Sequence, residues 1–152
     1  MELNLPAYDL DVRRLAGGSL QVYDRLRSKY VALTPEEWVR QHFVEYLIRE
    51  KHYPVSLMAN EVSLRLNGTL RRCDTVVYDR GMRPWVIIEY KAPEVEITQA
   101  VFNQIARYNL VMQAEYLIVS NGLTHYCCQY NHAAAKYSFV REIPDGYQCL
   151  KK

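Results

Sequence analysis

Residues 72–79 read Arg-Cys-Asp-Thr-Val-Val-Tyr-Asp, and residues 84–91 read Pro-Trp-Val-Ile-Ile-Glu-Tyr-Lys. β-Branched and aromatic residues dominate both segments, and the intervening Arg-Gly-Met-Arg is typical of a turn. The two segments therefore predict an antiparallel hairpin. The second segment is apolar on both faces, which is typical of a strand in the middle of a covered sheet.

The register of this hairpin brings charged residues together at its open end. A turn between Gly81 and Met82 places Asp74 directly opposite Glu89, and opposed residues of an antiparallel pair have Cβ atoms about 4.5–5.5 Å apart. Two carboxylates at that distance repel each other, and a divalent cation between them would remove the repulsion. Lys91 follows Glu89 by two residues and so projects from the same face of the strand.

This group of residues predicts the hydrolysis of a phosphodiester bond. Oxygen ligands suit Mg²⁺ or Mn²⁺, and we expect Asp74, Glu89 and the backbone carbonyl of Tyr90 to hold the cation. The cation would lower the pKa of a bound water and stabilise the leaving oxyanion. Lys91 would orient or deprotonate that water, or neutralise charge in the transition state. The structural alternative is a chance occurrence of a short motif.

Helices are predicted before and after the hairpin. Thr34 suits an N-cap, Pro35 the first helical position and Glu37 the acidic position of a capping box, so the first helix runs from here to about Lys51. A second helix spans about residues 98–113. Further strands are predicted at residues 62–66, 116–119, 124–130 and 137–142, with a short hairpin within residues 20–33. This order predicts an α/β fold with a mixed central sheet flanked by helices.

The same residues resemble a known family. Asp74 with Glu89-Tyr90-Lys91 resembles the core of the PD-(D/E)XK nuclease superfamily, although Cys73 stands where the superfamily's name has Pro. Gln104 and Tyr108 resemble the Q-x-x-x-Y element of its RecB-like branch. Over roughly residues 30–125 the chain is similar to the N-terminal nuclease domain of type I restriction enzyme R subunits, on segments 34–41, 72–74 and 89–93 together with Glu61.

The resemblance implies a restriction-endonuclease-like core that acts as a stand-alone, Mg²⁺- or Mn²⁺-dependent DNA endonuclease. It assigns Asp74 and Glu89 as metal ligands and Lys91 as the catalytic lysine. It also implies DNA as a partner, and it leaves open further restriction–modification subunits and a homodimer. The rival interpretation is a DNA-binding or assembly module that retains the nuclease fold without cutting.

The resemblance further implies a glutamate of the first helix near the metal, and Glu36 and Glu37 are both candidates. We favour Glu36, because it shares a helix face with Val39 and Phe43 and because the capping box already explains Glu37. The alternative is that both glutamates only favour the positive N-terminus of the helix.

Three further residues are predicted to support the site. Gln104 would bond the carboxylates or a DNA phosphate and Tyr108 would brace it, unless Gln104 only edges the apolar stripe and Tyr108 is ordinary core. Arg72 belongs to a basic cluster, since residues 65–91 contain six Lys and Arg residues against three Asp and Glu. Such a rim suits phosphate binding, and a solvated hairpin is the alternative.

Composition limits the remaining classes. A chain of 152 residues with 49% apolar residues suits one domain, with residues 1–33 as an N-terminal extension and residues 34–142 as its core. The net charge of +2 excludes a polycationic tail protein. The four cysteines form no Cys-x-x-Cys pair, so we expect free thiols in the cytoplasm. Neither a membrane span nor a nucleotide-binding Walker motif is present in the sequence.

Overall fold

The computed structural model describes residues 2–151, and its main feature is a six-stranded mixed sheet. The strands lie in the spatial order of the chain and comprise β4 (Met58–Leu66), β5 (Thr69–Tyr78), β6 (Pro84–Tyr90), β7 (Tyr116–Ser120), β8 (His125–Asn131) and β9 (Lys136–Val140). Only β6 and β7 are parallel, and the crossover between them contains a helix. The predicted α/β class with a mixed central sheet is confirmed.

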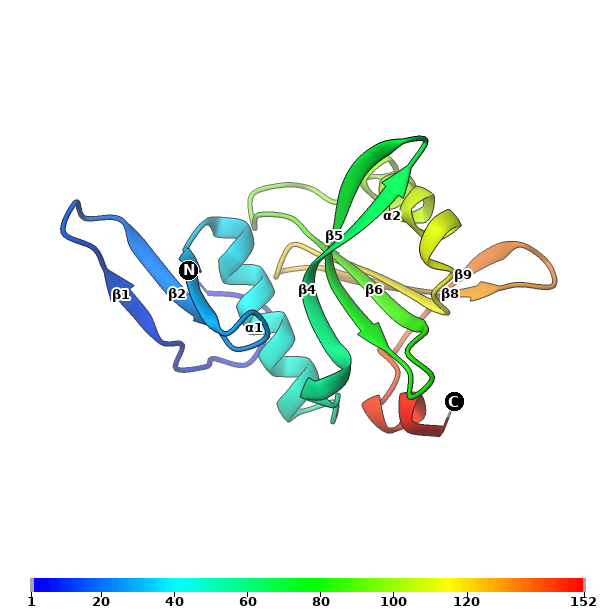
Figure 1. Cartoon of the computed structure of the whole chain (residues 1–152), viewed down its shortest axis with the longest axis horizontal. Helices are drawn as coiled ribbons and strands as arrows, with labels where there is room; N and C mark the ends of the chain where they lie inside the picture. Colours follow the sequence, from blue (N-terminus) through cyan, green and yellow to red (C-terminus); the bar gives the residue numbers. More distant parts are fainter. Residues whose placement is uncertain (1, 152) are drawn as a thin grey trace.

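Two helices cover opposite faces of this sheet (Figure 1). On one face, α1 (Pro35–Arg49) packs its buried Phe43 in a core cluster with Ile88 and Ile118. On the other face, α2 (Gln99–Met112) packs Ile105 in a second cluster with Ile87 and Leu117. Neighbouring residues of one strand thus serve opposite cores, because successive side chains of a strand alternate between its faces.

The hairpin of β5 and β6 has the predicted register where it matters for the site. Thr75 pairs with Ile88 and Val77 with Val86, so Asp74 comes opposite Glu89. The pairing next to the turn differs from the predicted one by one residue. Tyr78 pairs with Pro84, and the N–H of Asp79 donates to the carbonyl of Arg83 at 2.8 Å. A bulge between Val77 and Tyr78 absorbs this difference.

The start of α1 shows one correction to the sequence prediction. Thr34 is the N-cap, and its Oγ1 accepts the N–H of Glu37 at 3.1 Å, as expected. The reciprocal bond of a capping box is missing, because the Glu37 carboxylate binds arginine side chains while the N–H of Thr34 donates to the carbonyl of Ala32. Charge-assisted hydrogen bonds to arginine are stronger than a bond to a neutral N–H.

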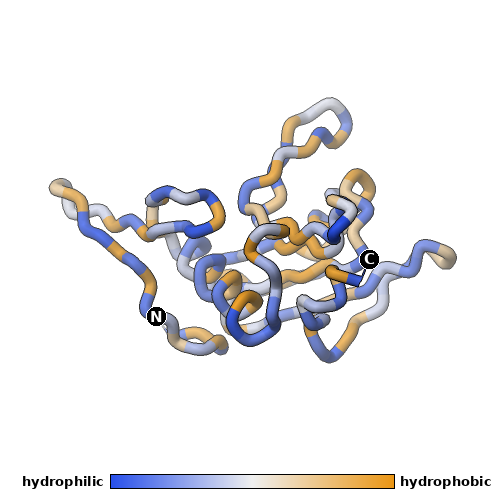
Figure 2. Tube along the Cα trace, turned by 60° about the horizontal axis from the view of Figure 1, so that its bottom comes forward, coloured by the Kyte–Doolittle hydropathy of each residue, from blue (hydrophilic) through white to orange (hydrophobic). Residues whose placement is uncertain are grey.

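A separate three-stranded sheet precedes α1 and projects from the rest of the molecule (Figure 1). Its strands are β1 (Val12–Arg14), β2 (Leu20–Asp24) and β3 (Lys29–Ala32), of which only the β2–β3 hairpin was predicted. Two short 3-10 helices, η1 (Val55–Leu57) and η2 (Gly146–Lys151), were not predicted either. Figure 2 shows hydrophobic positions gathered in the central strands, while the projecting hairpins alternate in hydropathy.

The four cysteines are all free and all buried. Within residues 2–151, no helix combines the length and the apolar character that crossing a membrane requires.

Candidate active site

The two carboxylates predicted as metal ligands lie side by side at the open end of the β5–β6 hairpin. Regular pairing ends at Thr75 and Ile88, and the carboxylate of Asp74 then accepts the backbone N–H of Tyr90 at 2.8 Å. Glu89 is 8% exposed. Burial raises the pKa of Glu89, and the neighbouring charge of Asp74 and a hydrogen bond with it raise this pKa further. Burial likewise raises the pKa of Asp74.

This arrangement fits a divalent cation. Burial and the charge of Asp74 both raise the pKa of Glu89, and a cation bound between the two carboxyls would offset this effect. Among residues 2–151, no group of three or more His, Cys, Asp or Glu side chains is placed to hold a metal ion. Two carboxylates completed by main-chain oxygen and water would be a donor set typical of Mg²⁺.

Lys91 and Tyr90 follow Glu89 and have different roles in the geometry. The charge of Lys91 lowers the pKa of Glu89, so its ammonium group acts on the carboxyl pair. Its backbone N–H donates to the carbonyl of Ser120 at 2.9 Å, which anchors this residue to β7. The ring of Tyr90 points to the other face, where its hydroxyl donates to Thr75 Oγ1 at 3.0 Å. Only the main chain of Tyr90 can therefore contribute to a cation site.

The two glutamates at the start of α1 differ in their surroundings. Glu36 is exposed, and its charge raises the pKa values of both Asp74 and Glu89. Glu37 is buried and accepts hydrogen bonds from Arg40 and Gln41. The carboxylate that faces the pair without being bound by arginine is therefore that of Glu36, in keeping with our preference for it.

Gln104 and Tyr108 lie one turn apart on α2 and touch each other. The amide of Gln104 donates to the hydroxyl of Tyr108 at 3.1 Å. Burial is the largest cause of the raised pKa of Tyr108, and the charge of Glu89 contributes to it. The structure thus brings Tyr108 close to Glu89, with Gln104 attached. Contact of Gln104 with a carboxylate or a phosphate stays a prediction.

The predicted basic cluster is divided between two places. Arg71 and Arg72 lie on the β4–β5 hairpin, whose tip bends out of the sheet beside α2 (Figure 1), whereas Arg80 and Arg83 lie in the β5–β6 turn, at the other end of the sheet from Asp74 and Glu89. Arg72 is exposed on β5 and pairs across the hairpin with Ser63. Its neighbour Arg71 is also exposed, and the charge of Arg71 acts on Tyr108.

Sequence reasoning missed a buried group of charged residues behind Asp74. Arg40 of α1 is 8% exposed and donates from Nη1 to the main-chain carbonyl of Asp74 at 2.8 Å. It also binds the carboxylates of Glu37 and Glu61, each at 2.9 Å. A signal was available, because Arg40 directly follows Val39 in the apolar stripe and lies one turn after Glu37.

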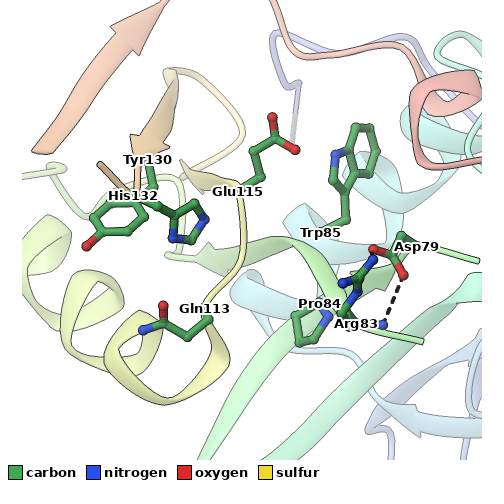
Figure 3. Close-up of a pocket in the computed structure, with 8 residues that line it drawn as sticks. All are labelled: Asp79, Arg83, Pro84, Trp85, Gln113, Glu115, Tyr130 and His132. Carbon is green, nitrogen blue, oxygen red and sulfur yellow. Dashed lines mark hydrogen bonds and ion pairs between the residues drawn. The ribbon is translucent and has the colours of Figure 1, made fainter. Parts of the chain in front are cut away.

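The opposite end of the sheet contains a hollow of about 370 Å³, which none of the predicted site residues lines (Figure 3). Its wall includes Asp79 and Arg83 from the turn of the hairpin, with Glu115 directly before β7 and His132 directly after β8. Asp79 accepts the N–H of Arg83 at 3.1 Å, and the guanidinium of Arg83 lies 3.5 Å from its carboxylate. The charge of Asp79 is thus compensated within its own turn.

Comparisons with known proteins identify the family of the chain. Residues 35–144 match the family model described as type I restriction enzyme R protein N terminus. The fold is similar to a fragment of a putative HsdR subunit of a type I restriction enzyme from Vibrio vulnificus YJ016, with a TM-score of 0.54 and 13% identity over 77% of this chain. The chain spans 25% of the length of that fragment. No curated protein matches the sequence. Because the family model covers most of the chain, the protein belongs to the family of type I restriction enzyme R protein N-terminal domains.

Proposed function

We propose that this protein is a metal-dependent endonuclease that hydrolyses phosphodiester bonds of DNA with Mg²⁺ or Mn²⁺. The observation that carries the proposal is the buried pair of Asp74 and Glu89 at the open end of the β5–β6 hairpin. A fold uses two adjacent buried carboxylates at a cost in stability, since like charges disfavour each other's ionised form. A bound cation offsets that cost, so cation binding would explain why the fold contains this pair.

Each residue of the site then has a defined part. Asp74 and Glu89 would hold the cation together with the main chain of Tyr90, and Glu36 would contribute a carboxylate from the outer side. When bound, the cation supplies Lewis-acid stabilisation of charge on a phosphate and a more acidic water. Lys91 would orient the attacking water and balance negative charge that develops on the phosphate. Gln104 and Tyr108 would support the phosphate from α2.

DNA as the substrate follows from the family and from the charge around the site. Type I restriction enzymes provide the context of the family, so DNA and other subunits of such an enzyme are the partners that we propose. Arg71 and Arg72 on the bent hairpin are exposed and available to phosphates. Cytoplasmic localisation belongs to the same proposal.

The proposal is tested with wild-type protein beside Asp74→Asn, and with Asp79→Asn, directly after the same strand, as the matched control. We expect Mn²⁺ binding in calorimetry and nicking of plasmid DNA for the wild type and Asp79→Asn, and neither for Asp74→Asn. Metal binding without nicking would indicate that a partner or another substrate is required. Absence of binding in all three proteins would support the non-catalytic module instead.

A further inference from the structure

Arg40 occupies an unusual position for an arginine, buried in the middle of α1 and directed at the backbone of the candidate active site. Its Nε and Nη2 donate to the two oxygens of Glu37 at 2.9 Å each, and Nη2 also reaches Glu61 at 2.9 Å. Its Nη1 donates to the carbonyl of Asp74 at 2.8 Å. A planar guanidinium bound on all sides has one orientation, so the carbonyl of Asp74 is held in one place.

The backbone at Asp74 needs such support, because the sheet is irregular there. β4 and β5 pair at Asn60–Thr75 and at Val62–Cys73, with Glu61 and Asp74 between these pairs. Glu61 has a φ of 58°, in the left-handed region that costs a residue with a side chain free energy. The regular ladder is thus interrupted at the strand position that carries a predicted metal ligand.

The same group connects the site to the N-terminal sheet. Arg27, in the turn between β2 and β3, donates to the carboxylate of Glu37 at 2.8 Å and also binds Asp24. From Asp24, hydrogen bonds of 2.6 to 3.0 Å lead through Asn60 and Thr75 to Tyr90. The backbone N–H of Tyr90 in turn donates to the carboxylate of Asp74. Asp74 is therefore held through its carbonyl by Arg40 and through its carboxylate by Tyr90, and both connections reach residues before α1.

We propose that Arg40 is a positioning residue that fixes Asp74 for cation binding, and that Arg27 makes the N-terminal sheet part of the same unit. This inference rests on the proposed function, because the cation belongs to that proposal. Stability alone does not explain Arg40. Replacing all partners of a buried ion pair by apolar residues is often neutral or stabilising, so stability alone does not require an arginine at this core position of α1.

The test uses Arg40→Lys in the full chain, since lysine keeps the charge and loses the planar fork. One readout is amide hydrogen exchange at Tyr90 by NMR, because its N–H bonds the Asp74 carboxylate. The other readout is Mn²⁺ affinity by calorimetry. We expect faster exchange at Tyr90 and a loss of about 10–100-fold in affinity, the range seen for residues that orient metal ligands.

The matched control is Arg25→Lys, because Arg25 also joins the N-terminal region to α1 through an ion pair of 3.0 Å with Glu45. We expect both readouts to be unchanged in this control. A folded Arg40→Lys protein with wild-type exchange at Tyr90 and wild-type affinity would overturn the proposal.

Two further outcomes remain interpretable. If Arg40→Lys does not fold, Arg27→Gln takes its place, with a smaller loss in the same direction expected and unchanged values counting against the proposal. If the wild type binds no Mn²⁺, the proposed nuclease function fails, and exchange at Tyr90 still decides whether Arg40 holds Asp74.

Discussion

The part of β5 that pairs with β6 is flanked by two aspartates, Asp74 where the regular pairing ends and Asp79 directly after Tyr78, and the two differ in the groups around the carboxylate. Each carboxylate accepts a backbone N–H from across the hairpin, Asp79 from Arg83 at 3.1 Å and Asp74 from Tyr90 at 2.8 Å. At the turn end the guanidinium of Arg83 lies 3.5 Å from Asp79, whereas at the open end the buried carboxyl of Glu89 lies beside Asp74 and has a raised pKa.

This difference shows that neither hydrogen-bond geometry nor hollow volume identifies the candidate active site. The local bonding of the two aspartates is nearly the same, and the hollow of about 370 Å³ lies at the turn end. Incompletely compensated carboxyls distinguish the open end, because the pKa of Glu89 is still raised to about 9 although Lys91 lowers it. A buried group that the fold does not neutralise is a better indicator of chemistry than the size of the nearest cavity.

The largest effect is expected from substitution of Lys91, at the open end of the hairpin. Lys91→Ala should lower the rate of DNA cleavage by about 10²–10⁴-fold, the usual contribution of a group that transfers or positions a proton. Mn²⁺ binding should survive in this variant, because Lys91 is not a ligand. The matched control is Arg83→Ala at the turn end, where the side chain is 76% exposed. Equal loss of cleavage in both variants would remove the distinction between the two ends.

Stability should change in opposite directions at the two ends. Glu89→Gln removes a carboxyl whose pKa is raised to about 9 in the folded state and is ordinary in the unfolded chain, so it should raise the free energy of unfolding without metal by about 1–2 kcal/mol. Asp79→Ala removes compensated hydrogen bonds and should lower it by about 1 kcal/mol. Because the folded state raises the pKa of Glu89, ionisation of this residue costs stability as pH rises, so the gain from Glu89→Gln should be larger at pH 8 than at pH 5.

Urea unfolding with and without Mn²⁺ measures both changes. Mn²⁺ should stabilise the wild type and Asp79→Ala and leave Glu89→Gln unaffected. A destabilised Glu89→Gln protein in the absence of metal would contradict the idea that the open end is uncompensated.

The smallest effect concerns a histidine near each end. His125 packs beside the open end, with Nδ1 at 2.7 Å from Ser120 Oγ and Nε2 at 2.9 Å from the carbonyl of Asn4. Burial lowers the pKa of His125, so the unfolded chain binds a proton more readily, and stability should fall as pH drops below about 6.5. We expect the loss of stability below about pH 6.5 to be smaller in His125→Gln. In His132→Gln, whose histidine lies in the exposed wall of the hollow, we expect this loss to be unchanged. Denaturation curves from pH 7.5 to pH 5 provide the measurement.

The sequence predicts the sheet well because local signals and the global fold agree there. The turn within residues 80–83 gives the register of β5 and β6, and the bulge at Val77 compensates an imperfect turn without moving Asp74. Asn67-Gly68 forms the β4–β5 turn, and both residues have positive φ. The fold class with its mixed sheet therefore follows from pattern alone.

The surroundings of the site could not be predicted in the same way. Spacing suggests a capping box for Glu37, but Arg27 lies ten residues earlier and Glu61 more than twenty residues later, and only the folded chain brings them together around Arg40. The spacing of two residues in the sequence does not indicate which of several possible charged partners a side chain binds in the folded protein. The exposed β1 strand lacks an apolar face, so no periodicity reveals it.

The left-handed backbone at Glu61 has a consequence beyond the site. β4 is the outermost strand of the six-stranded sheet, and an outermost strand with free backbone groups is a template on which other chains can add strands. A residue with φ of 58° in its middle bends the strand and breaks the even spacing of donors and acceptors along its free side. The irregularity that leaves Asp74 to be held by Arg40 therefore also protects the molecule from edge-to-edge aggregation.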